Sequence, residues 1–210
     1  MSDFNQQTSQ LIIIPGSPAI IPGLGFGDAP SYELAQIIGQ QLEKAKHNSY
    51  ADIVGSRCQQ WHTQHTGSLR AWGQPSLNIS MGNYLPELIA AYFLDAAGIE
   101  IAESRDRLEP VTPDRLTVVV IDGSAGLNAK APLSLLPTAD TLHQWCMELL
   151  SDPKKASRPL SAAELRDGGI IEPDLWLELS HLAPRVHQAQ LLSSDTTLGV
   201  GRYIATWEIA

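Results

Sequence analysis

The sequence is poor in cysteine, with only Cys58 and Cys146, which form no CxxC pair. A small secreted domain that depends on disulfides needs more cysteines than this. Residues 1–10 are polar and contain no basic region, and the first apolar run, residues 11–14, is too short for a signal sequence or a membrane span. We therefore expect a cytoplasmic protein without a membrane partner, and a flexible tail over residues 1–10.

Basic residues are also scarce. The chain has 14 Lys and Arg against 23 Asp and Glu, which gives a formal net charge of −9. Proteins that bind nucleic acids usually concentrate Lys and Arg, so a phosphate backbone is not an expected partner. Hydrophobic residues make up 43% and charged residues 18% of the 210 positions, which is typical of a globular protein. The length favours a single domain over residues 1–210.

Short β-branched runs alternate with segments of helical periodicity. The pattern predicts strands at residues 11–14, 50–54, 77–80, 116–121 and 201–209, and helices at 31–46, 83–98, 138–150 and 174–182. Residues 56–76 have no period and predict a long surface loop. The alternation favours a three-layer α/β/α fold with a mostly parallel or mixed central sheet. Residues 11–14, 51–54 and 116–121 should be neighbouring strands of that sheet.

In such sheets, ligands bind where the carboxyl ends of the strands meet. The loop at residues 122–132 places Asp122 and Ser124 directly after the strongest predicted strand, and Lys130 follows shortly. A carboxylate, a hydroxyl and an ammonium are suited to a small polar or anionic ligand, to which Lys130 would donate a charge-assisted hydrogen bond. The alternative interpretation is an ordinary turn with a solvated lysine.

A second strand-end loop, residues 55–73, is rich in polar and aromatic side chains. His62 and His65 would share one face if the loop were locally helical, and imidazole is a good ligand for zinc or iron. No third ligand is specified, so a solvated loop or hydrogen bonding to a substrate remain alternatives. Cys58 could act as a nucleophile beside His62. We expect residues 57–73, with Trp61 and both histidines, to form the wall or lid of the cleft.

Several short motifs also point to a known family. In chain order they are Ile14-Pro-Gly-Ser-Pro18, His65-Thr-Gly-Ser68, Trp72-Gly73, Gly82-Asn-Tyr-Leu-Pro-Glu-Leu88, Asp122-Gly-Ser-Ala125, Lys130-Ala-Pro132 and Gly199-Val-Gly-Arg-Tyr-Ile-Ala-Thr-Trp207. The chain resembles a family of actinobacterial proteins described as similar to the subunit-B domain of the class III extradiol ring-cleavage dioxygenases. The resemblance implies an α/β fold and a non-haem iron(II), held by two histidines and a carboxylate, that cleaves catechol-like rings.

The chain differs from that family at the positions that bind the metal. Pro15 occupies the position of the first histidine ligand, and the sequence after the second predicted strand is Gly55-Ser56-Arg57-Cys58. We therefore expect a non-canonical member without a metal cofactor, which binds a small polar or anionic molecule. It should purify with far less than one equivalent of metal and leave catechol uncleaved. The candidate ligand-binding residues are Ser17, His65, Ser68, Asp122, Ser124 and Lys130.

Other functions remain open at this point. The chain could be a metal-dependent oxidoreductase that holds non-haem iron or zinc through His62 and His65. It could be a metal-free enzyme that uses Asp122, Ser124 and Lys130, or a partner-binding protein with a vestigial cleft. A homo-oligomer is compatible with each of these functions.

Overall fold

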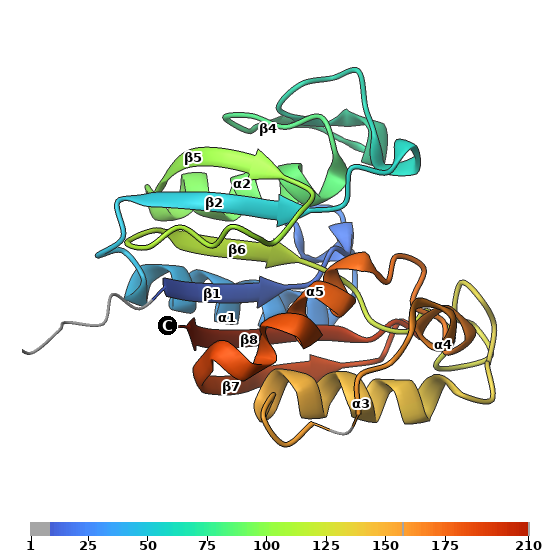
Figure 1. Ribbon diagram of the computed structural model, residues 1–210. Helices are drawn as coiled ribbons and strands as arrows, with labels where there is room; N and C mark the ends of the chain where they lie inside the picture. Colours follow the sequence, from blue (N-terminus) through green and yellow to red (C-terminus); the bar gives the residue numbers. More distant parts are fainter. Residues whose placement is uncertain (1–8, 157, 210) are drawn as a thin grey trace, which may run out of the picture.

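The computed structural model describes residues 9–156 and 158–209 (Figure 1). The first strand, β1 (Ser9–Ile14), begins two residues before the predicted strand. Ser9 and Gln10 therefore belong to the sheet and not to a tail, whereas residues 1–8 lie outside the described residues. None of the described helices is both long and apolar enough to cross a membrane.

The core of the molecule is a six-stranded mixed sheet in the order β5-β2-β6-β1-β8-β7. The other strands are β2 (Tyr50–Gly55), β5 (Glu100–Arg105), β6 (Leu116–Val120), β7 (Val186–Asp195) and β8 (Arg202–Ile209). The first four strands in this order are parallel to one another, whereas β8 is antiparallel to β1 and β7 is antiparallel to β8. The prediction that β2, β6 and β1 are neighbours is confirmed.

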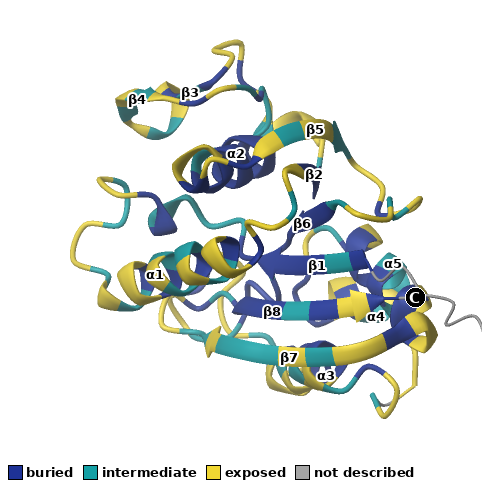
Figure 2. Ribbon diagram, turned by 90° about the vertical axis from the view of Figure 1, so that its left-hand side faces the viewer, coloured by how far each residue is buried: buried dark blue, intermediate teal, exposed yellow. Residues whose placement is uncertain are grey.

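Helices cover both faces of the sheet (Figures 1 and 2). The helices α1 (Ala29–Lys44) and α2 (Leu85–Ala97) pack on one face, in a cluster with inward residues such as Ile12 and Val118. The helices α3 (Ala139–Ser151), α4 (Ala162–Asp167) and α5 (Asp174–Leu182) pack on the other, with Ile13 and Val119. Successive residues of a strand point to opposite faces, which is why uninterrupted apolar strands can bury both sides.

Strand β8 shows how the sequence pattern determines packing. The alternating residues Tyr203, Ala205, Trp207 and Ile209 all face the α3–α5 layer. Ile204 points to the opposite layer. Trp207 is completely buried, and its Nε1 donates to the Leu150 carbonyl at 3.0 Å, so the polar group of this large ring is satisfied.

Some elements differ from the prediction. They are edge strands, a small hairpin outside the main sheet and the start of one helix. Strands β5 and β7 were not predicted, because edge strands are half solvated and their sequences are correspondingly polar. The predicted strand at 77–80 instead contributes to a separate two-stranded sheet, β3 (Ser68–Leu69) with β4 (Gln74–Asn78). The predicted long loop therefore contains a small hairpin. The Glu87 carboxylate stabilises the start of α2 by accepting from the Asn83 and Tyr84 backbone N–H groups.

Candidate functional site

A cavity of about 590 Å³ opens at the carboxyl ends of the parallel strands. The segments after β1, β2 and β6 line it with residues 16–18, 56–58 and 121–123, and Asp106 and Arg107 follow β5. Residues 171–175, just before and at the start of α5, form the opposite wall. Strand β6 lies between β2 and β1, so the three strand ends converge on one point. The cavity volume lies within the range of small-molecule sites in proteins.

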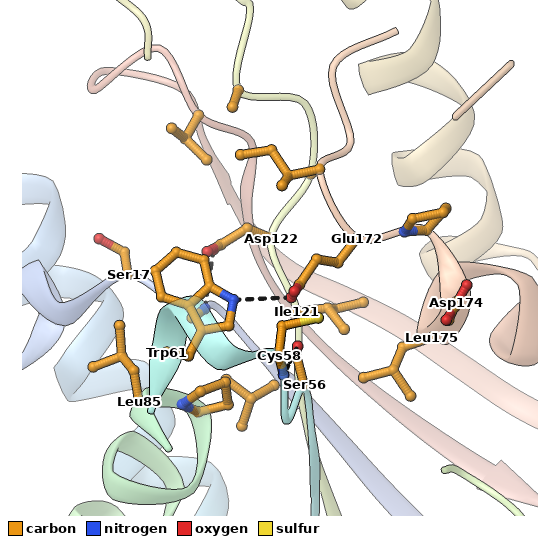
Figure 3. Close-up of a pocket in the computed structure, with 18 of the residues that line it drawn as sticks. Ser17, Ser56, Cys58, Trp61, Leu85, Ile121, Asp122, Glu172, Asp174 and Leu175 are labelled. Atoms are coloured by element: carbon orange, nitrogen blue, oxygen red, sulfur yellow. Dashed lines mark hydrogen bonds between the residues drawn. The ribbon is translucent and has the colours of Figure 1, made fainter. Parts of the chain in front are cut away.

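Asp122 is the polar residue at the centre of this site (Figure 3). Its Oδ1 accepts from the Gly16 backbone N–H at 2.9 Å, and its carbonyl accepts from Trp176 Nε1 at 2.8 Å. A Cβ on Gly16 would lie 3.0 Å from Oδ2, so the glycine allows this close approach. Oδ2 has no hydrogen-bond partner among the described residues. The side chain is therefore fixed at one oxygen and available at the other.

Burial in this apolar environment raises the pKa of Asp122 from 3.8 to about 6. The nearby Glu172 carboxylate raises it further, whereas the Gly16 hydrogen bond and the charge of Arg202 lower the pKa. A carboxyl group with such a pKa is mostly ionised at neutral pH, where it accepts hydrogen bonds, and it can also take up or release a proton near physiological pH.

This raised pKa predicts a pH-dependent stability. Between about pH 4 and pH 6 the folded protein keeps the Asp122 proton while the unfolded chain loses it, so the contribution of Asp122 to stability falls as pH rises through this window and is level above it. A rise from 3.8 to about 6 corresponds to at most about 3 kcal/mol. We expect Asp122→Asn to match the wild type near pH 4 and to exceed it by up to about 3 kcal/mol at pH 7.

Urea unfolding at a series of pH values measures this difference, and the comparison with wild type cancels the contributions of other carboxylates. Asn keeps an oxygen that can accept from Gly16, so the variant removes the charge with little change in shape. The interpretation of Asp122 is wrong if the two proteins differ by a constant amount from pH 4 to pH 7.

Trp61 and Glu172 close one side of the cavity. Trp61 Nε1 donates to Glu172 Oε2 at 3.0 Å (Figure 3). Gln60 Nε2 donates to Oε1 of the same carboxylate at 3.4 Å. The segment after β2 is thereby joined to the segment before α5. Cys58 lies beside the same carboxylate, whose interaction raises the pKa of the thiol above its ordinary value. The thiolate is the nucleophilic form of cysteine, so this environment disfavours a reactive Cys58 at neutral pH.

Arg202, at the start of β8, lines the cavity, but its guanidinium is held in a hydrogen-bond network away from it. Its guanidinium is completely buried. Nε donates to Asp195 Oδ2 at 2.8 Å, Nη1 donates to Asp28 Oδ2 at 3.0 Å, and Nη2 donates to Thr197 Oγ1 at 3.1 Å. Ser31 also accepts from Nη1. This network joins the start of α1 to the β7–β8 hairpin.

The structure brings together only part of the predicted set. Ser17 and Asp122 line the cavity, together with Cys58 and Trp61. Other predicted residues lie outside the lining: buried Ser124, exposed Lys130, exposed His65 and half-buried Ser68. The Ser124 hydroxyl accepts from the Gly126 N–H at 3.2 Å, and the Ser68 hydroxyl accepts from the Arg70 N–H at 3.2 Å. These residues therefore do not form a single concave site, and ligand contact by any of the six remains a prediction.

The residues do not fit the iron site implied by the resemblance. Pro15 carries no ligating group, and the position after β2 presents Ser56, Arg57 and Cys58 where the family has histidine. His62 and His65 are exposed and absent from the cavity lining. Over residues 9–156 and 158–209, no three His, Cys, Asp or Glu side chains form a metal-binding group. A site of two histidines and one carboxylate is thus not present in this cleft.

The sequence did not predict that Glu172 and Arg202 line the site, and the reason differs between the two residues. Glu172 lies in a Gly-rich stretch, 168–173, that shows no strand before it, and only the packing of α5 brings it to the cleft. Arg202 opens the final strand, where an arginine normally indicates a solvated end. Arg202 precedes a run of alternating apolar residues. That alternation predicts that the strand is buried, but it does not predict burial of the arginine with which the strand begins.

No protein-family model matches this chain, and no curated protein is significantly similar to it.

Proposed function

We propose that this chain is a small-molecule-binding α/β protein that uses the cavity at the carboxyl ends of β1, β2 and β6. The observation that carries this proposal is the position of the Asp122 carboxyl group. The carboxyl group is held by Gly16 at one oxygen and presents the other to a cavity of about 590 Å³. A few polar groups within mostly apolar walls are typical of ligand-binding pockets.

We further propose that the scaffold is the one implied by the class III extradiol dioxygenase resemblance, used without its metal. The support is the placement of the strand-end segments. Those after β1 and β2, which supply histidine ligands in that family, line the cavity here with Gly16, Ser17, Ser56 and Cys58. These groups can contact a ligand by hydrogen bonding and packing.

Two variants test whether the cavity or the Lys130 loop binds the ligand. A library of small apolar compounds carrying one polar group is screened by NMR, with the Trp61 indole N–H as reporter. We expect Val200→Trp to weaken every hit by more than about tenfold, because Val200 lines the cavity and a larger side chain fills it. Lys130→Ala should leave the same affinities unchanged, because Lys130 lies outside the lining.

The opposite result would support the site expected from the sequence, on the 122–132 loop. If Lys130→Ala weakens the hits by about tenfold to a hundredfold and Val200→Trp does not, the ligand lies on the 122–132 loop and the proposed cavity is not the site.

A further inference from the structure

Most of the arginines that line the cavity are paired with carboxylates outside it. Three of them form such ion pairs: Arg57 with Glu87 at 2.8 Å, Arg107 with Glu178 at 3.0 Å, and Arg202 with Asp28 at 3.0 Å. None of these three carboxylates lines the cavity. The fourth, Arg166, is exposed and forms no salt bridge within the described part of the chain. The charges of Arg57, Arg107 and Arg202 are therefore balanced by carboxylates outside the cavity.

The acidic groups of the cavity form no such ion pairs among the described residues. Four carboxylates line it: Asp106, Asp122, Glu172 and Asp174. None of the four forms a salt bridge with another described residue. When the paired arginines are counted with their partners, one exposed arginine remains against four carboxylates. The cavity thus carries net negative charge.

Two of these carboxylates face the same space. Asp122 comes from the end of β6 and Glu172 from the segment before α5, and Figure 3 shows both beside the Trp61 ring. The charge of Glu172 raises the pKa of Asp122, as expected of like charges that lie close together. A positive charge placed between them would relieve this repulsion.

The remaining walls are apolar. Leu85, Pro86, Ile121 and Leu175 line the cavity with Trp61, whose indole is fixed by its hydrogen bond to Glu172. An aromatic face beside a carboxylate favours an organic cation over a metal ion or a hydrated anion, because the ring attracts the charge and packs on the attached carbon atoms.

We infer that the ligand is a small organic amine, with its ammonium group between Asp122 and Glu172 and its apolar body against Trp61, Leu85 and Leu175. This inference rests on the proposed function, since it assigns the ligand class of the same cavity. The inferred ligand is a cation, whereas Lys130 in the sequence suggested an anionic ligand.

Three compounds of matched shape test the charge: phenylpropylamine, phenylpropanol and phenylpropionate. Each is titrated into the full chain at pH 7 and followed by the Gly16 and Gly123 amides and the Trp61 indole N–H. We expect the amine to bind at least about tenfold more tightly than the alcohol, with the carboxylate weakest. The same titration at pH 5 should weaken the amine by up to about tenfold per pH unit below 6, because Asp122 takes up a proton there.

The alcohol should show little of this pH dependence. The charged or titratable groups that face Asp122 are Glu172, Arg202 and Tyr203. Of these, Tyr203 does not titrate in this range, because burial raises the pKa of its hydroxyl well above the ordinary value. A change of amine affinity between pH 7 and pH 5 therefore reports the carboxylates.

Charge-removing variants localise the effect. Glu172→Gln keeps an oxygen to accept from Trp61 Nε1, so the wall stays in place, and it should reduce the preference for amine over alcohol by about tenfold. Asp122→Asn should do the same, whereas Asp140→Asn, on an exposed turn of α3 outside the cavity, should leave the preference unchanged.

The outcomes separate the two proposals. Tighter binding of the alcohol or the carboxylate, with shifts at the cavity amides, overturns the amine assignment and leaves the binding function standing. An amine preference that survives both Glu172→Gln and Asp122→Asn also overturns it. If no compound shifts the cavity resonances of the folded protein, both the amine assignment and the proposed cavity site fail.

Discussion

Arg202→Met is expected to destabilise the protein by about 3–5 kcal/mol. Removing one partner of a buried ion pair leaves the other charges in the interior without compensation. Here the variant leaves two carboxylates, Asp28 and Asp195, which now hold the buried guanidinium at 3.0 Å and 2.8 Å. Met fills a similar volume, so the lost charge and not a cavity dominates the change. Urea unfolding at pH 7 measures the effect.

Two further variants separate charge from packing. Lys46→Met removes an exposed ion pair with Glu43 and should change stability by about 0–1 kcal/mol. Adding Asp28→Asn and Asp195→Asn to Arg202→Met should recover a large part of the loss, because no unpaired charge is then buried. The network is not the stabilising element described above if Arg202→Met costs no more than Lys46→Met.

Trp176→Ala should cost a similar amount, about 3–5 kcal/mol, through loss of core packing. Trp176 is completely buried and packs edge-to-face on Tyr203, with ring centroids 5.8 Å apart. It also supports the site directly, because its Nε1 donates to the Asp122 carbonyl at 2.8 Å. The loss of stability is measured by urea unfolding, in parallel with the pH series for Asp122.

Trp176→Phe divides this effect into two parts. Phe keeps most of the aromatic packing but leaves the Asp122 carbonyl without its donor, which should cost about 1–3 kcal/mol. We also expect the contribution of Asp122 to the pH dependence of stability to become smaller in both variants, because a less fixed Asp122 can reach solvent. A Trp176→Ala variant as stable as Trp176→Phe would show that packing of this ring contributes little.

The layered fold and the edge of the sheet where the site lies follow from the apolar runs and their order along the chain. Residues 11–14, 51–54 and 116–120 are apolar almost throughout, and only a strand covered on both faces buries such a run. Their neighbouring positions and the carboxyl-end location of Asp122 follow from the topology rules for parallel strands. Alternation along β8 likewise specified its buried face, because side chains repeat every two residues in a strand.

Which side chains near that edge face the cavity depends on tertiary packing, and the sequence pattern does not predict it. His62, His65 and Lys130 follow the correct strands, yet loop backbone conformation turns them to the surface, and no sequence period encodes that direction. Glu172 and Arg202 reach the cleft from elements far away in the chain, through the packing of α5 and the pairing of β8 with β1. The sign of the cavity's charge was decided there as well. It depends on which arginines find carboxylate partners outside the cavity, and such pairs form between residues distant in sequence.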